Sequence, residues 1–316
     1  MPSENKGQMM QAVRYREYGG PEVVVVEQVA VPQPKAGQVL VRIHATGLNP
    51  MDWKLRQGYM KAYMPIDFPF TPGTDIAGVV EAVGPGVTTL QLGEAVFGLG
   101  SGGYAEYAIA PAANLVHKPA NISFEEAATI PVAALTAWQA LFDHGGLEAG
   151  QRVLVQAAAG GVGGYAVQFA LWKNAGEVIG TASSENVEYV RSLGAQTVID
   201  YNSIAFQDVV KDVDLVIDGV GGETQKHSFE VLRPGGLLIS IVGPPSEELA
   251  KTYKVRTAFF GMNHKPQQLQ EITDLIASGQ IKTEVGPVFP LNEARQAQVV
   301  SQKGHVRGKI ILRSAD

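Results

Sequence analysis

The 316-residue sequence predicts an α/β protein of two domains, one a doubly wound parallel sheet and the other a compact, mostly antiparallel β domain. Three observations predict this fold class. An apolar strand at 153–155 breaks into glycines and continues as a helical segment, strands and helices alternate after it, and short strands separated by Gly and Pro precede it.

The run from Val153 to Ala166 is the most informative part of the chain. Gly161, Gly163 and Ala166 fit the pattern G-x-G-x-x-[GA], in which glycines permit a tight turn and a close approach of the backbone to a pyrophosphate. The helix that follows presents free N–H groups and a positive dipole end to an anion. We therefore expect a dinucleotide site at Ala159, Gly160, Gly161, Val162 and Gly163, although a strand-to-helix turn of this kind can also bind nothing.

Strands and helices alternate after the glycines, as in a parallel sheet that is covered on both faces. This context favours the dinucleotide interpretation and predicts a Rossmann domain over 126–262. Strands are expected at 177–182, 197–200, 213–220, 236–242 and 255–260, with helices at 186–193 and around 223–232.

The chain before the glycines has a different texture, with short strands at 23–29, 38–45, 76–83, 95–98 and 104–110. These predict the antiparallel domain over 1–125. The last part, 263–316, reads as a helix at 267–277, a β segment at 281–289, a helix at 292–302 and a strand at 309–312. It could extend the nucleotide sheet, but the Pro-rich run 286–290 favours a return segment that completes the first domain.

Composition excludes several classes of function. A net charge of −6 without a dense basic block argues against nucleic-acid binding, and the absence of Cys removes disulfides, thiolate catalysis and cysteine-based zinc sites. The six His residues show no metal-binding spacing, so no metal is expected. No signal peptide or membrane span is recognisable, which makes a cytoplasmic location the default expectation.

Ordered motifs are spread along nearly the whole chain: ATGLNPMDWK at 45–54, FTPGTDIAGVV at 70–80, GYAEY at 103–107, the glycine turn, and RGKIIL at 307–312. With them the sequence resembles the medium-chain dehydrogenase/reductase superfamily, specifically its zinc-free quinone oxidoreductase branch, which includes zeta-crystallin and plant enone oxidoreductases. The resemblance implies a GroES-like catalytic domain, a Rossmann domain, NADPH and usually a homodimer. Zinc-dependent relatives carry Cys at the position of Asn49 and Gly-His-Glu at the position of 73–75, and the lobe with four structural Cys is missing here.

Cofactor choice is read at the end of the second Rossmann strand, where NAD enzymes place an acid for the ribose hydroxyls. Thr181, Ser183 and Ser184 stand there without a carboxylate before Glu185, which favours NADPH. The serines can also cap the next helix, and both roles can hold. Relatives carry a Lys shortly after this pair, so neutralisation of the 2′-phosphate stays open. By the resemblance, Tyr201 lies near the adenosine.

The resemblance also places Asn49, Asp52, Trp53 and Lys54 beside the nicotinamide. Lys54 can contact the ribose or stabilise a developing enolate, or it can be a solvated surface cation. Asp52 is interpreted as an orienting acceptor rather than an acid, because no burial that would raise its pKa is indicated. Further cofactor contacts are expected from Val220, Val242, Gly243, Phe259, Phe260, Arg307 and Lys309, most of them at strand ends.

Hydride transfer needs no protein nucleophile, which suits a chain without Cys. The predicted function is NADPH-dependent, metal-free reduction of quinones or α,β-unsaturated carbonyls, with no obligatory general acid. The alternative is an NADPH-binding structural or regulatory protein of the zeta-crystallin type with little turnover. A homodimer is predicted through the strand at 236–242, interpreted as an exposed sheet edge.

Overall fold

The computed structural model describes residues 7–314, which divide into two compact units. Of the described residues, the β unit holds 7–132, 264–277 and 283–314. The α/β unit holds 133–263 with the short segment 278–282. The chain therefore enters the α/β unit at Ala133, leaves it after Asn263, and returns for 278–282 before its last two strands.

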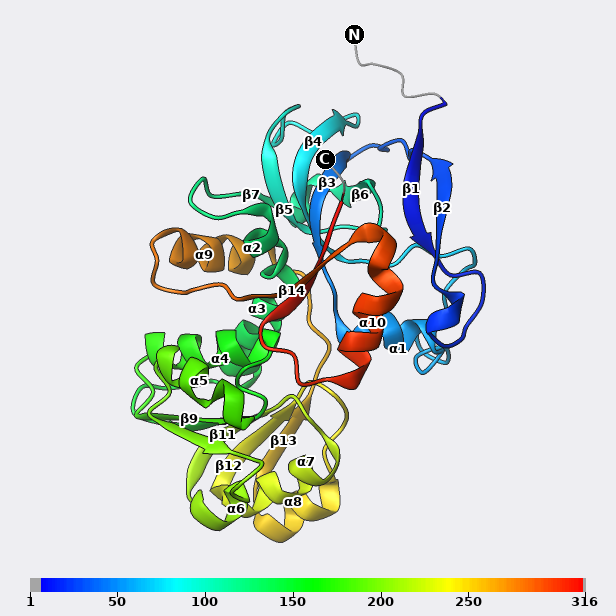
Figure 1. The fold of residues 1–316 in the computed structure, drawn as a ribbon. Helices are drawn as coiled ribbons and strands as arrows, with labels where there is room; N and C mark the ends of the chain where they lie inside the picture. Colours follow the sequence, from blue (N-terminus) through cyan, green and yellow to red (C-terminus); the bar gives the residue numbers. More distant parts are fainter. Residues whose placement is uncertain (1–6, 315–316) are drawn as a thin grey trace. The chain divides into compact units, whose positions relative to one another are not determined.

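The β unit contains a seven-stranded sheet with the order β14-β15-β3-β4-β5-β7, and β6 pairs with β3 beside this path. Figure 1 shows β3, β4 and β5 side by side. All pairs are antiparallel except β14–β15. The strands are β3 Gln38–Gly47, β4 Asp75–Val83, β5 Ala95–Leu99, β6 Tyr107–Pro111, β7 Leu115–His117, β14 Val285–Pro290 and β15 Lys309–Arg313. The antiparallel GroES-like sheet expected from the sequence is thus confirmed.

Other elements of the β unit include a separate hairpin, whose second strand was expected at 23–29, and several helices. The hairpin joins β1 Met9–Arg14 to β2 Val25–Ala30. The helices are α1 Pro50–Arg56, α2 Phe124–Ala128, α9 Pro266–Ala277 and α10 Ala294–Lys303, of which α9 and α10 were expected. Helix α3, Pro131–Trp138, begins in this unit and continues in the other.

The α/β unit is built on a six-stranded parallel sheet with the order β10-β9-β8-β11-β12-β13. Counted along the chain, this is the order 3-2-1-4-5-6 of the dinucleotide-binding fold, so the Rossmann prediction is confirmed. The strands are β8 Arg152–Val155, β9 Glu177–Ala182, β10 Thr197–Asp200, β11 Val213–Asp218, β12 Leu232–Ser240 and β13 Arg256–Phe259, and the helices are α4 Gly161–Trp172, α5 Val187–Ser192, α6 Phe206–Val209, α7 Gly222–Ser228 and α8 Glu247–Tyr253.

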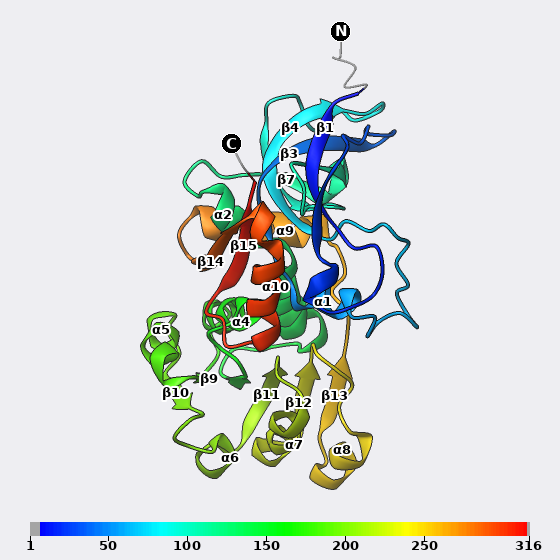
Figure 2. The same ribbon diagram turned by 45° about the vertical axis from the view of Figure 1, so that its right-hand side comes forward.

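One prediction about this sheet is wrong. The strand at 236–242 was interpreted as an exposed edge, but β12 pairs with β11 on one side and β13 on the other, as Figure 2 shows. The edge strand is β13 instead. The apolar character of β12 therefore reflects burial inside a sheet rather than a surface for a partner.

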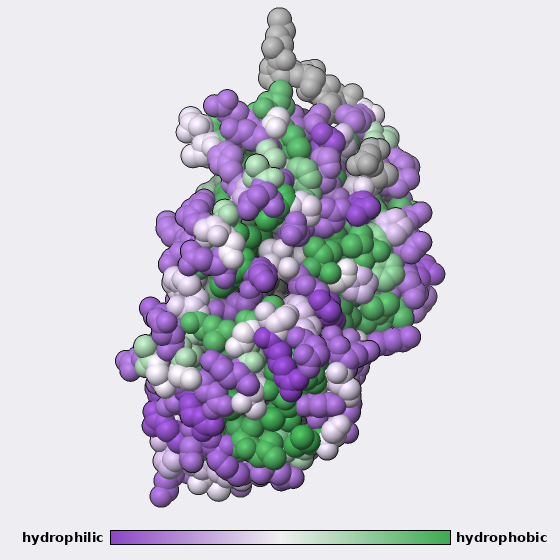
Figure 3. Space-filling view, turned by 60° about the vertical axis from the view of Figure 1, so that its left-hand side comes forward, coloured by the Kyte–Doolittle hydropathy of each residue, from purple (hydrophilic) through white to green (hydrophobic). Residues whose placement is uncertain are grey.

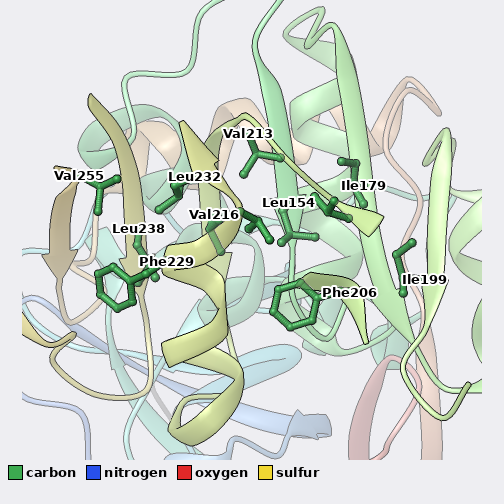
Figure 4. Packing of buried hydrophobic residues seen from close by; sticks show 12 residues of the cluster. Leu154, Ile179, Ile199, Phe206, Val213, Val216, Phe229, Leu232, Leu238 and Val255 are labelled. Carbon is green, nitrogen blue, oxygen red and sulfur yellow. The ribbon is translucent and has the colours of Figure 1, made fainter. Parts of the chain in front are cut away.

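Apolar side chains from neighbouring strands form the core of the α/β unit. Leu154, Val216 and Leu238 come from β8, β11 and β12, and Phe206 and Phe229 pack against them from the covering segments (Figure 4). On the surface, hydrophobic patches are separated by hydrophilic regions on the face shown in Figure 3. Within residues 7–314, none of the helices has the length and apolar character needed to cross a membrane.

Candidate active site

Helix α1 begins at a polar turn that the motif ATGLNPMDWK encodes. Asn49 is the N-cap, Pro50 takes the first helical position, and the Asp52 carboxylate accepts a hydrogen bond from the Asn49 backbone N–H at 2.8 Å. The Asn49 side chain also bonds to Asp75 and to Lys309. This turn therefore both starts the helix and places the Asn49 side chain in a polar cluster.

Asn49, Asp75 and Lys309 form a buried polar triad. The Lys309 ammonium lies 2.6 Å from Asn49 Oδ1 and 2.5 Å from Asp75 Oδ2, and Asn49 Nδ2 donates to the same carboxylate oxygen at 2.9 Å. The second Asp75 oxygen accepts from the Val132 N–H at 2.7 Å. The side chains of Asp75 and Lys309 are 0% and 5% exposed, so the two charges compensate each other away from water.

Strand register explains why the triad forms. Asp75 on β4 is paired with Gly47 on β3, and Gly47 is also paired with Ile311 on β15. A Cβ at Gly47 would lie 2.7 Å from Lys309 Cε and would also collide with the Ala128 carbonyl. The glycine of the ATG motif thus leaves the space through which the lysine reaches the aspartate.

Asp52 lies beside the buried hydroxyl group of Tyr104. The Tyr104 O–H donates to Asp52 Oδ2 at 2.7 Å, and both side chains are buried. Burial raises the pKa of Asp52 to about 6, although the donors Asn49 N–H and Tyr104 O–H lower it. Burial and the neighbouring Asp52 also hold the pKa of Tyr104 well above its usual value. The sequence did not indicate the burial of Asp52 that the structure shows, while its predicted accepting role agrees with the contacts.

Trp53 and Lys54 follow on the half-buried part of α1. The Lys54 ammonium lies 5.7 Å from the centre of the Trp53 ring, within range of a cation–π interaction. The Trp53 Nε1–H is buried and has no hydrogen-bond partner among the described residues. A buried donor of this kind is rare in a finished core and is expected where a ligand or an ordered water completes the site.

The donor set around the triad does not fit a zinc ion. Zinc sites in proteins use thiolate, imidazole and carboxylate ligands, whereas the triad offers one amide and one carboxylate that a lysine already neutralises. Among residues 7–314, no group of three or more His, Asp or Glu side chains is placed to hold a metal ion. No chemical step is therefore assigned to a metal.

The glycine turn of the α/β unit joins β8 to α4. Gly160 is the N-cap of α4, a helix of 12 residues, and Gly161 is its first residue. A Cβ at Gly163 would lie 2.8 Å from the Ala158 Cα and would also collide with the Ala157 carbonyl, so the helix can approach the turn only with glycine there. Ala159 and Val162 complete the turn. The helix N-terminus faces the carboxyl edge of the sheet, where dinucleotides bind in this fold.

A side-chain network supports the turn from below. Thr181 Oγ1 donates to Gln156 Oε1 at 2.7 Å and accepts from the Ala157 N–H at 3.2 Å. Ala157 has a positive φ of 54°, which non-glycine residues rarely adopt. Thr181, predicted as a cofactor contact, is buried and lies beneath the turn, and a direct contact with a nucleotide stays a prediction.

The serines after β9 have partners that the sequence did not reveal. Ser183 Oγ accepts from Asn186 Nδ2 at 2.9 Å, and Ser184 bonds to the Asp200 carboxylate, which lowers the pKa of that acid. Asp200 ends the neighbouring strand β10, so an acid stands beside the serines although none precedes Glu185 in the local sequence. Tyr201 follows it and is 42% exposed.

The remaining predicted cofactor residues lie on the carboxyl ends of β11, β12 and β13 or near the C-terminus. Val220 and Phe259 are exposed, Val242 and Gly243 are half-buried, and the Phe260 ring stacks on His144 at 4.2 Å. Arg307 forms an exposed ion pair with Glu284, and Lys309 is held in the triad. No observation tests their contact with a cofactor, so these assignments stay predictions.

The β unit also contains a pocket of about 500 Å³ that none of the predicted site residues lines. It is lined by Gln11, Glu106, Val288, Phe289, Pro290, Leu291, Asn292, Arg313 and Ser314. Residues that sequence reasoning missed are Asp75 and Tyr104 as site members and Gln156 as a support. Asp75 lies in the motif at 70–80 and Tyr104 in the motif at 103–107, so their place in these motifs could have indicated that they belong to the site.

Comparison with known proteins agrees with the fold. Residues 35–120 match the alcohol dehydrogenase GroES-like domain family, and residues 193–312 match a family described as zinc-binding dehydrogenase. The chloroplast envelope quinone oxidoreductase homolog of Arabidopsis thaliana is 36% identical over 97% of this chain and 99% of its own length.

Two solved structures are similar over the whole fold. A mycobacterial protein in complex with NADPH has a TM-score of 0.88 at 31% identity and covers 96% of this chain and 99% of its own. An NAD-dependent alcohol dehydrogenase has a TM-score of 0.89 at 31% identity, with 97% and 100% covered. The two neighbours differ in the cofactor that their names give.

Proposed function

Because the chain belongs to the quinone oxidoreductase branch of the medium-chain dehydrogenase/reductase superfamily, we propose that it is an NADPH-dependent, metal-free reductase of quinones or α,β-unsaturated carbonyls. The glycine turn at the start of α4 carries the proposal, because its backbone can approach a pyrophosphate closely at the carboxyl edge of a Rossmann sheet. Bound NADPH supplies the hydride.

The β unit supplies groups that can stabilise negative charge on a substrate oxygen. The Lys309 ammonium donates to the side-chain carbonyl oxygen of Asn49, and Asn49 Nδ2 donates one of its hydrogens to Asp75. These two bonds fix the orientation of the amide, and its second hydrogen is left to donate to a substrate oxygen. Lys54 and the unpartnered Trp53 N–H lie on the same helix. Preorganised donors of this kind stabilise charge that develops during reaction.

The metal-free part of the proposal is supported by the triad. The Lys309 ammonium neutralises Asp75, and the residue that corresponds to the Cys ligand of zinc-dependent relatives is an amide. We expect treatment with a chelator to leave turnover unchanged. One tightly bound zinc per chain, with activity lost on its removal, would overturn this part.

NADPH as the cofactor is supported by Ser183, Ser184 and the NADPH complex of the mycobacterial neighbour. The position of Asp200 favours NADH, because its carboxylate bonds to Ser184 and can accept hydrogen bonds from ribose hydroxyls. Steady-state kinetics with both reduced cofactors decides between them. A higher kcat/KM with NADH would transfer the assignment to that cofactor.

The decisive experiment measures oxidation of the reduced cofactor across a panel of quinones and enones. We expect turnover of at least one class. Cofactor binding without turnover on either class would favour the alternative, an NADPH-binding structural or regulatory protein.

Lys54→Met gives a matched comparison with Lys61→Met, which removes an exposed lysine of the following loop. We expect kcat to fall about ten- to a hundredfold for Lys54→Met, because a charge-stabilising donor is lost, and to stay unchanged for Lys61→Met. Equal kcat values for the two variants would make Lys54 a solvated surface cation.

We also propose that the protein is a homodimer that works in the cytoplasm. The dimer is supported by β13, whose outer edge ends the sheet among the described residues, and by the exposed Phe259 on it. The cytoplasmic location rests on the sequence expectation, and the Arabidopsis relative is named for a different compartment.

A further inference from the structure

The loops that follow β11 and β12 are tied together by polar side chains that the sequence analysis did not assign. Asp218 ends β11 and is fully buried. Its Oδ1 accepts from the backbone N–H groups of Val220 and Gly221 at 2.9 and 2.8 Å. The carboxylate therefore shapes the turn between β11 and α7 from inside.

Gln225, on α7, joins this turn to the next loop. Its Nε2 donates to Asp218 Oδ2 at 2.8 Å and to the Gly243 carbonyl oxygen at 3.3 Å. A carboxylate and a carbonyl only accept, and an amide nitrogen has two hydrogens, so both donors of Gln225 are used. This arrangement allows one orientation of the amide.

Ser240 completes the attachment of Gly243. Its Oγ accepts from the N–H groups of Val242 and Gly243, both at 3.3 Å. Gly243 is thus held at its N–H by Ser240 and at its carbonyl by Gln225. Ser240 and Gln225 thus fix the backbone of the loop after β12. Gln225 also bonds to Asp218 and so links this loop to the loop after β11.

We propose that Asp218 and Gln225 are positioning residues that hold the backbone of Val220 and Gly243 in place for the nicotinamide end of the cofactor. The proposal rests on the proposed function, which brings a nicotinamide to the carboxyl ends of β11 and β12. It goes further by naming two side chains that act through the loops and do not touch the cofactor. The adenosine end binds at β9 and β10 and does not depend on them.

The Asp218 carboxylate is needed because it only accepts hydrogen bonds, and so it fixes which end of the Gln225 amide faces it. Asn at position 218 keeps an acceptor for the Val220 and Gly221 N–H groups but turns a donor toward Gln225. The Gln225 amide then rotates to present its oxygen, and the hydrogen bond to Gly243 is lost. Asp218→Asn and Gln225→Met therefore break the same link by different chemistry.

The experiment compares binding of NADPH with binding of 2′,5′-ADP, a probe that lacks the nicotinamide. We expect Gln225→Met to weaken NADPH binding about tenfold, equivalent to about 1.4 kcal/mol, and to leave 2′,5′-ADP binding unchanged. Gln207→Met on α6 is the matched control, since it removes a half-buried glutamine of the same unit, and its two affinities should equal those of the wild type.

Asp218→Asn should reproduce the effect of Gln225→Met, and the double variant should be no weaker than either single variant. In Gln225→Met, the loss of NADPH affinity should exceed the loss of 2′,5′-ADP affinity by about threefold or more. A smaller difference overturns the proposal, because a general weakening of the fold affects the binding of both probes. Failure of the proposed NADPH site looks different, since the wild-type protein would then bind neither probe, and failure of the reductase activity shows as binding of both probes without turnover. If the wild type binds NADH instead, the same comparison is made with NADH and ADP-ribose.

Discussion

Lys309→Met tests the buried triad directly, because it removes the cation that pairs with Asp75. The Asp75 carboxylate stays fully buried and keeps two donors, the Val132 N–H and Asn49 Nδ2, at 2.7 and 2.9 Å. Breaking a buried ion pair by removing one partner costs about 3–5 kcal/mol, and the two remaining donors place the expected loss at about 3 kcal/mol. The matched control is Arg307→Met, which removes an ion pair whose arginine side chain is 49% exposed, and the expected loss there is below about 1 kcal/mol.

The assay is amide hydrogen exchange of peptides from β3 and β15, which reports the free energy of opening of the β unit separately from the rest of the chain. Asp75→Asn in the Lys309→Met background removes the uncompensated charge, so the double variant should recover about 2 kcal/mol relative to Lys309→Met. Equal losses for Lys309→Met and Arg307→Met, or additive losses in the double variant, would refute the reasoning that the triad is a compensated buried pair.

Three further predictions concern pH, cofactor choice and assembly. Because burial raises the pKa of Asp52 from 3.8 to about 6, the folded protein binds the proton more tightly than the unfolded chain, and its stability falls as the pH rises through this window. Relative to Asp52→Asn, the wild type should lose about 2–3 kcal/mol of unfolding free energy between about pH 4 and pH 7 in urea titrations, and a loss on acidification would contradict this sign. Ser183→Asp should weaken NADPH binding about ten- to a hundredfold and change NADH binding much less, since a carboxylate repels the 2′-phosphate; equal weakening would mean that Ser183 only supports the turn before α5. Light scattering should give a mass about twice that of the 33.6 kDa chain, and a monomer at micromolar concentration would refute the homodimer without affecting the cofactor proposal.

By itself the sequence determined the fold class and the kind of cofactor site. The glycine turn, the alternation of strands and helices, and the Gly- and Pro-bounded strands before them are local patterns, and each is read within a short window of the chain. The absence of Cys needs no structure at all. The branch of the superfamily followed from motifs such as ATGLNPMDWK, which resemble the family residue by residue.

Only the tertiary structure decided which residues meet. Asp75 and Lys309 are 234 positions apart, and they pair because β4 and β15 both lie beside β3 at Gly47. Asp200 reaches Ser184 because β10 and β9 are neighbours, and the raised pKa of Asp52 arises from burial under elements that are distant in the chain. Strand order and burial depend on the packing of the whole sheet, and a local pattern does not encode them. The same reason explains why β12 reads as an edge from its sequence and lies inside the sheet in the structure.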